Sequence, residues 1–177
     1  MVNKIPRDLV GEVLFSTAQE VFTSMLGTEL TRQGDPDESI PQPFDGVMSF
    51  VGLIGDWIGT GFFICDSAIA SDVASRFLMT SFESINDEVL DAVGEVTNIV
   101  MGSMKNRLEE DLGPLKMSTP TVVYGKNVST RTMKNDLAMS VRCSYATGEV
   151  LFKVCLARML TPCDGEQRAR TGPIAIR

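Results

Sequence analysis

The stretch DAVGEVTNIVMG, residues 91–102, combines two opposite faces in the spacing of an α-helix. Its polar positions are separated by four, three and four residues, so a helix places them on one side. They are Asp91, Glu95, Asn98 and Gly102. Apolar positions fall on the other side, at Val89, Val93, Val96, Val100 and Met104. Such a helix buries its apolar face and presents a carboxylate, a carboxamide and a glycine to another molecule.

Apolar periodicity and turn residues predict further elements on both sides of this helix. Helices are expected over residues 6–30, 68–79 and 86–110. Strands are expected over residues 44–54, 58–65, 121–124, 136–145 and 150–160. Ser84 and Asn86 are both candidates for the N-cap of the long helix. We therefore expect an α+β fold, with an antiparallel sheet covered by three helices.

The first helix repeats the polar line of the long helix in a weaker form. Ser16, Glu20, Thr23 and Gly27 have the same spacing. Strand-like segments accompany both helices, so we expect two similar halves related by a pseudo-two-fold axis. Threonine stands in the first copy where the second has Asn98, so only the second copy keeps the amide.

The chain of 177 residues has the size of one compact domain. We assign residues 1–160 to this domain. Residues 161–177 are polar, contain Gly and Pro and have no periodicity, so we expect an extended or disordered tail.

Composition excludes several classes of function. The net charge of −7 argues against nucleic acid as a partner, because phosphates require a basic surface. No run of 18 apolar residues is present, so we expect no membrane insertion. The first residues lack the apolar core of a signal peptide, and we expect a cytoplasmic protein.

The chain contains no histidine and four cysteines, none of them in a CxxC pair. Without histidine, Ser-His or Cys-His catalysis and the common zinc sites are excluded. Cys65, Cys143 and Cys155 lie in apolar, strand-like runs, so we expect buried, reduced thiols. We expect no metal site in this chain.

The spacing of Asp91, Glu95 and Asn98, followed by Pro120, resembles the motif of the CheC/FliY/CheX family of chemotaxis phosphatases. AQEVFTSMLG in the first helix, the hairpin around residues 55–61 and STPTVVYG at residues 118–125 extend the resemblance. Together these stretches cover most of residues 10–160. With one asparagine-bearing copy, the chain is most similar to CheX. The fold implied is CheX-like, with two pseudo-symmetric halves.

The resemblance implies that the chain hydrolyses the aspartyl phosphate of a phosphorylated CheY-like response regulator. Asn98 would position the attacking water, and Glu95 would pair with the regulator's active-site lysine. Asp91 and Gly102 would contact the partner. The chain would need no cofactor of its own, since Mg²⁺ is held by the regulator. The family also implies a homodimer, for which an edge strand such as residues 136–145 is suited.

Other interpretations of the same residues stay open at this stage. Glu95 and Asn98 could belong to an ordinary solvated helix face, and Asp91 could serve only the helix dipole. The chain could be a non-catalytic module that binds a response regulator without hydrolysing its phosphate. It could also be a structural partner in a flagellar or sensory assembly. The sequence does not identify the regulator.

Overall fold

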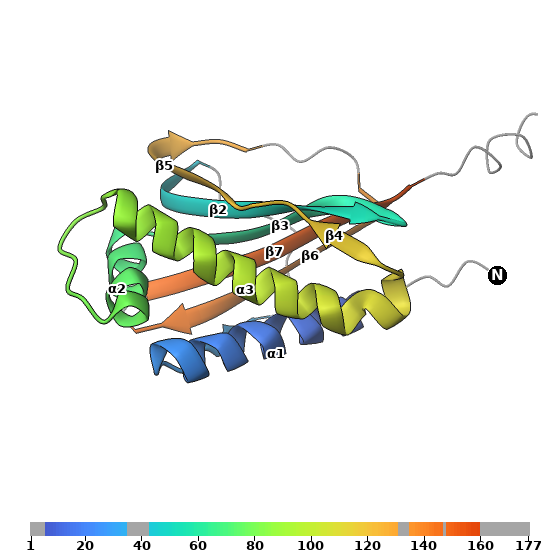
Figure 1. Cartoon of the computed structure of the whole chain (residues 1–177), viewed down its shortest axis with the longest axis horizontal. Coiled ribbons are helices and arrows are strands. Elements are labelled where there is room, and N and C mark those ends of the chain that lie inside the picture. The colour runs from blue at the N-terminus through green and yellow to red at the C-terminus, as the bar shows by residue number, and fades with distance from the viewer. Residues whose placement is uncertain (1–5, 35–42, 131–134, 147, 160–177) are drawn as a thin grey trace, which may run out of the picture.

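The computed structural model describes residues 6–34, 43–130, 135–146 and 148–159. It confirms the predicted α+β architecture, in which three helices cover one face of an antiparallel sheet (Figure 1). The predicted tail, residues 161–177, and Cys163 within it lie outside the described residues. Within the described ranges, no helix combines the length and the apolar character that crossing a membrane requires.

All three predicted helices and all five predicted strands are present. The helices are α1 (Arg7–Leu26), α2 (Ser67–Leu78) and α3 (Asp87–Leu112). The strands are β1 (Thr31–Gln33), β2 (Phe44–Gly55), β3 (Trp57–Cys65), β4 (Leu115–Met117), β5 (Thr121–Val128), β6 (Leu137–Tyr145) and β7 (Gly148–Arg158). The sequence did not predict β1 and β4, because each has only three residues and so shows no alternation.

The predicted extent of the first helix was wrong at its C-terminal end. The helix stops at Leu26 instead of residue 30, because Gly27 adopts a left-handed conformation with φ 62°. Its N–H binds the carbonyl of Phe22, which closes the last turn. Gly27 therefore lies past the end of α1, whereas its counterpart Gly102 lies inside α3.

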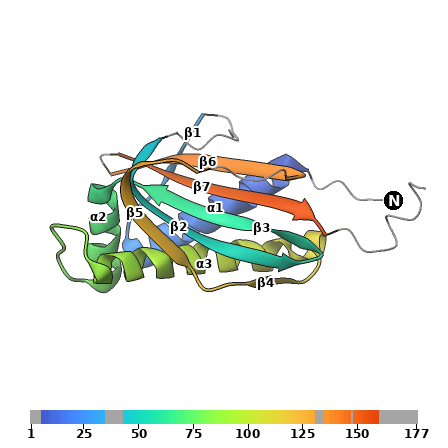
Figure 2. The same cartoon turned by 90° about the horizontal axis from the view of Figure 1, so that it is seen from above.

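The strand order is β1-β6-β7-β3-β2-β4, with β5 also paired to β2 (Figure 2). This order is symmetric about the central β7–β3 pair. Exchanging the halves converts β1 into β4, β6 into β2 and β7 into β3, while α1 corresponds to α3. The topology thus confirms the two predicted halves, and α2 and β5 are additions to the repeat within the described residues.

The predicted edge strand, β6, is partly covered. β1 pairs with it in antiparallel register from Thr31 opposite Ser144 to Gln33 opposite Arg142. Only the N-terminal part of β6 lacks a neighbour on that side among the described strands. The homodimer therefore remains a prediction from the sequence.

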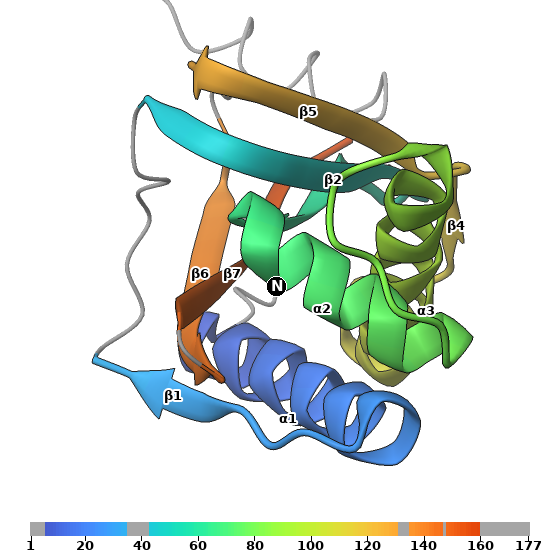
Figure 3. The same cartoon turned by 90° about the vertical axis from the view of Figure 1, so that its left-hand side faces the viewer.

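The core lies between the helices and the sheet. α1 and α3 run side by side along the sheet, and α2 lies at one end of it (Figures 1 and 3). An aromatic cluster joins the layers, with the Phe22 ring on α1 5.6 Å from Tyr145 and 5.7 Å from Phe152. The predicted apolar side of α3 is no more than 1% exposed at Val89, Val93, Val96, Val100 and Met104.

Three cysteines confirm the expectation of buried, reduced thiols. Cys65, Cys143 and Cys155 are free and buried. Burial raises the pKa of the Cys143 thiol to about 12 and raises the pKa of Cys65 even further. These thiols are protonated at neutral pH and act as apolar side chains.

The two candidate caps of α3 can be separated by mutation. The Asn86 side chain accepts a hydrogen bond of 2.9 Å from the Val89 N–H, whereas Ser84 is exposed and caps nothing. We expect Asn86→Ala to lower the free energy of unfolding by about 1 kcal/mol, since it leaves a helix N–H without a partner. Ser84→Ala should leave it unchanged. Urea denaturation followed by circular dichroism measures both, and equal losses would contradict the assignment of the cap.

Candidate functional site

The polar line predicted from the sequence is assembled on the outer side of α3. Asp91 and Glu95 are exposed, while Asn98 and Gly102 are half-buried. All four lie on one continuous helix, whose opposite side is fixed against the sheet. Because the valines on that opposite side are buried, the polar residues have no alternative but to face outward.

A segment between β4 and β5 borders this line on one side. A Cβ atom added at Gly94 would lie 3.3 Å from Val122 and 3.6 Å from Pro120, so the start of β5 packs directly on α3. Gly94 and Asn98 are one turn apart on this side of the helix, which explains why Asn98 is half-buried while Glu95 is exposed. Pro120, singled out in the sequence, therefore lies beside the amide-bearing face.

Ser118 holds the bordering segment in place, and the sequence analysis did not recognise its role. Its hydroxyl accepts a hydrogen bond of 2.8 Å from the Gly52 N–H and donates one of 2.8 Å to the Thr119 carbonyl. Its own N–H binds the Gly52 carbonyl at 2.9 Å. A serine two residues before a proline signals only a turn, and no local pattern predicts a contact with a strand 66 residues away.

The polar side chains of this line are not used in hydrogen bonds or ion pairs inside the described part of the chain. Within the described part of the chain, Asp91, Glu95 and Asn98 form no side-chain hydrogen bond or ion pair. The corresponding face of α1 differs, because Glu20 forms an ion pair with Arg107 of α3. Arg107 also donates a hydrogen bond of 3.2 Å to the Ser16 hydroxyl. The first copy thus uses its carboxylate to join two helices, whereas the carboxylate of the second copy forms no ion pair within the described residues.

The N-terminal half of α3 and the loop before it carry an unbalanced negative charge. Residues 77–104 contain no lysine or arginine. The exposed carboxylates there are Glu83, Asp87, Glu88, Asp91 and Glu95. This surface attracts cationic groups and raises the encounter rate with a basic partner. In the described ranges, no group of three histidine, cysteine or acidic side chains is placed to hold a metal.

Chemically, the face offers one carboxylate and one carboxamide a turn apart. A carboxylate accepts charge-assisted hydrogen bonds from a lysine or arginine. A carboxamide donates and accepts hydrogen bonds at once, so it can orient a water molecule. A carboxamide is not a nucleophile, so the amide is suited to orient a water molecule toward a reactive centre that another molecule supplies.

Comparison with known proteins relates this chain to a family. The family model described as "Chemotaxis phosphatase CheX" matches residues 47–144, which run from within β2 to within β6 and include all of α3. Among curated proteins, no significant match to this chain was found.

Solved structures share the whole fold. CheX from Vibrio vulnificus is 26% identical, with a TM-score of 0.75 over 84% of this chain and 99% of that chain. A CheC-like superfamily protein from Shewanella sp. PV-4 is 27% identical, with a TM-score of 0.69 over 83% and 96%. The CheX–CheY–BeF3–Mg²⁺ complex from Borrelia burgdorferi contains a chain that is 24% identical, with a TM-score of 0.72 over 83% and 97%.

The packing of this chain does not require a glycine at position 102. A Cβ atom there would meet only Met117, at an ordinary contact distance of 3.5 Å. Because glycine in a helix interior is less favourable than alanine, we expect Gly102→Ala to raise the free energy of unfolding by about 0.5–1 kcal/mol. Gly94→Ala should give no such gain, since its Cβ would be crowded by Val122. Chemical denaturation measures both, and a loss of stability at position 102 would show that the glycine serves the fold.

Proposed function

The chain belongs to the family of CheX chemotaxis phosphatases, and from this premise we propose that it hydrolyses the aspartyl phosphate of a CheY-like response regulator. One observation carries the proposal. Glu95 and Asn98 lie a turn apart on the outer face of α3, within the region that matches the family, and their side chains form no hydrogen bond inside the described chain.

Asn98 is proposed to position the attacking water. An aspartyl phosphate is a reactive acyl phosphate, so its hydrolysis needs a well-placed nucleophile more than a strong base. The water oxygen forms a bond to phosphorus while the bond to the aspartate oxygen breaks, which yields a carboxylate and inorganic phosphate. A carboxamide can hold this water in line, as a glutamine does in many GTPases. The absence of histidine is compatible with this chemistry.

The contribution required of such a residue is modest. A hundredfold acceleration corresponds to about 2.7 kcal/mol of barrier. Orientation of the reacting groups alone can supply several kcal/mol. The half-buried position of Asn98, one turn from where Gly94 meets Pro120, supports this role, because its limited freedom reduces the entropy lost when the water is bound.

Glu95 is proposed to fix the docking angle by pairing with the lysine of the regulator's phosphorylation site. Asp91 is placed to extend this contact, and Gly102 permits the close approach of the partner's backbone. The relative from Borrelia burgdorferi was solved as a CheX–CheY complex with BeF3 and Mg²⁺, which supports a CheY-like partner that brings the metal ion.

Asn98→Ala tests the role of the water-holding amide. We expect it to lower the rate of phosphate release from a phosphorylated CheY-like regulator by about tenfold to a hundredfold, since a positioning group is lost. Binding should persist, because almost all of the contact area remains. Substoichiometric chain and a phosphate-release assay give the rate, and titration calorimetry gives the affinity.

Asn106→Ala is the matched control, since Asn106 is an exposed amide further along the same helix. It should release phosphate at the wild-type rate. If Asn98→Ala does so too, the proposed mechanism is wrong. If wild type binds the regulator without accelerating phosphate loss, the chain is the non-catalytic module considered above.

Glu95→Ala tests docking in a different way. It should raise the Kd for the regulator and also lower kcat, because the ion pair both holds and orients the partner. We expect about a threefold to tenfold change in affinity, as for a partly desolvated ion pair. Glu95→Gln should recover part of the orienting effect on kcat, but its Kd should not show the salt dependence of the wild type. An affinity equal to wild type in both variants would refute the docking role.

A further inference from the structure

A groove of about 630 Å³ lies at the N-terminal end of α3, between α2, the α2–α3 loop and β5. It is separate from the polar line, and neither Glu95 nor Asn98 lines it. Hydroxyl groups, carboxylates and aromatic rings form its walls. They include Ser71, Asp72, Ser81, Phe82, Glu83 and Tyr124.

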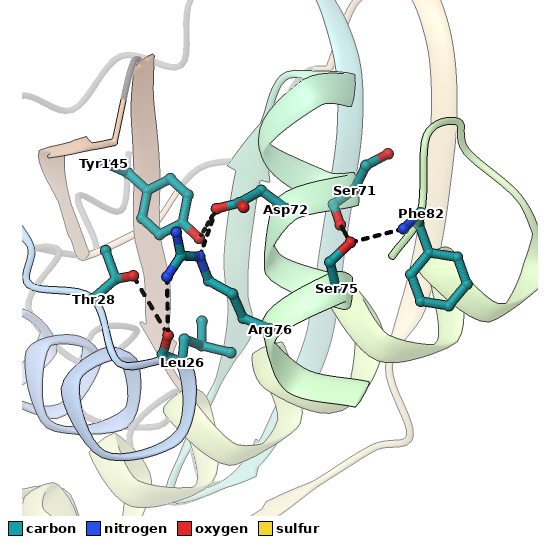
Figure 4. Close-up of polar contacts among 8 residues, drawn as sticks. All are labelled: Leu26, Thr28, Ser71, Asp72, Ser75, Arg76, Phe82 and Tyr145. Carbon is teal, nitrogen blue, oxygen red and sulfur yellow. Dashed lines mark hydrogen bonds and ion pairs between the residues drawn. The ribbon is translucent and has the colours of Figure 1, made fainter. Parts of the chain in front are cut away.

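One wall of the groove carries the hydroxyl of Ser71. Ser71 is only 8% exposed, and its hydroxyl forms no hydrogen bond within the described part of the chain. In Figure 4 this hydroxyl points away from α2, on the side where Phe82 lies. This hydroxyl is not sealed from solvent, so it can hydrogen-bond to water or to a polar group that enters the groove from outside.

The loop that forms the opposite wall is attached to α2. The Ser75 hydroxyl accepts a hydrogen bond of 3.0 Å from the Phe82 N–H and donates one of 2.7 Å to the Ser71 carbonyl (Figure 4). The two walls are therefore held at a fixed separation. A groove of this kind binds without first being ordered, which lowers the entropic cost of binding.

α2 is itself fixed to the rest of the molecule by a partly exposed polar network (Figure 4). Asp72 accepts hydrogen bonds from Tyr145 on β6, at 2.6 Å, and from Arg76, at 2.8 Å. Arg76 also reaches the Leu26 carbonyl at the end of α1, at 3.5 Å. The Asp72 carboxylate is thus already bound to Arg76 and Tyr145. Burial, together with this carboxylate, raises the pKa of Tyr145 far above its usual value.

The groove favours a cationic ligand. Glu83 is exposed and forms no ion pair within the described residues. Of the basic residues on α2 and β5, Arg76 is bound to Asp72 and Lys126 does not line the groove. The rings of Phe82 and Tyr124 complete a site of hydroxyls, a carboxylate and π faces. Such a site suits an ammonium or guanidinium group on an apolar stem.

We propose that this groove is a second docking site for the same partner, and that it accepts a lysine or arginine side chain from the surface of the response regulator. The inference rests on the proposed function. β5 connects the two sites, since Val122 packs beside Gly94 and Tyr124, two residues further on, lines the groove. Along α3, nine residues from Asn86 to Glu95 span about 14 Å. A footprint of about 800 Å² on each partner covers both sites.

Glu83→Gln tests the second site. We expect KM for the phosphorylated regulator, and Kd for the regulator activated with BeF3 and Mg²⁺, to rise about threefold at low ionic strength. kcat should stay within about twofold, because the groove does not touch the reacting atoms. The increase should largely disappear at 0.5 M NaCl, since salt screens an exposed charge pair.

Further variants separate charge from structure. Glu83→Lys should raise KM and Kd more than Glu83→Gln, since it replaces attraction by repulsion. Tyr124→Ala should also raise both, whereas Tyr124→Phe should keep wild-type values because it retains the ring. Glu110→Gln, at an exposed carboxylate near the other end of α3, is the matched control and should change neither constant.

The outcomes distinguish the groove from the proposed function. If wild type dephosphorylates the regulator but both Glu83 variants have wild-type KM and Kd, the groove assignment is overturned alone. If wild type binds without turnover and Glu83→Gln weakens binding, the phosphatase proposal fails and the groove stands. Absence of binding by wild type overturns both. Tight binding of spermidine at the groove, with unchanged regulator affinity in the Glu83 variants, would assign the groove to free amines instead.

Discussion

Burial of one side of α3 against the sheet is the constraint on which the rest of the structure depends. Five apolar side chains on that side are at most 1% exposed. Each buried valine or methionine contributes about 1.5–3 kcal/mol relative to an exposed one, so rotation of the helix about its axis is strongly opposed. The carboxylate and carboxamide on the other side are therefore held outward by the core, and neither forms a hydrogen bond within the described residues.

The two halves show how one framework serves two purposes. Both long helices carry a glutamate at the same position, and the sheet order relates them by a pseudo-two-fold axis. In the first half the glutamate is joined to Arg107 across the helix pair, and a threonine replaces the amide. In the second half nothing in the described chain neutralises Glu95. The two halves thus share one architecture but differ in surface chemistry. The glutamate of the first half joins two helices, whereas the glutamate of the second half stays unpaired within the described residues.

A few hydrogen bonds hold the segments around the candidate site and the groove in a fixed arrangement. Ser118 holds the segment beside Asn98 to β2, and Ser75 holds the α2–α3 loop to α2. The network of Asp72 then fixes α2 to α1 and β6. A surface that is already ordered loses little entropy on docking, which leaves more of the interaction energy for affinity and orientation.

The sequence determined the elements whose signal is local. The valine spacing of α3 fixed which side is buried, Asn86 and Gly113 delimited that helix, and alternation with turn residues located the long strands. Local patterns could not show that residues 27–30 leave the helix, or that three-residue strands would pair. Nor could they show that Arg107 would reach Glu20, that Ser118 would hold the site, or that α2 and its loop would enclose a groove. Those features depend on contacts between residues far apart in the chain, and only the packing of the whole domain brings them together.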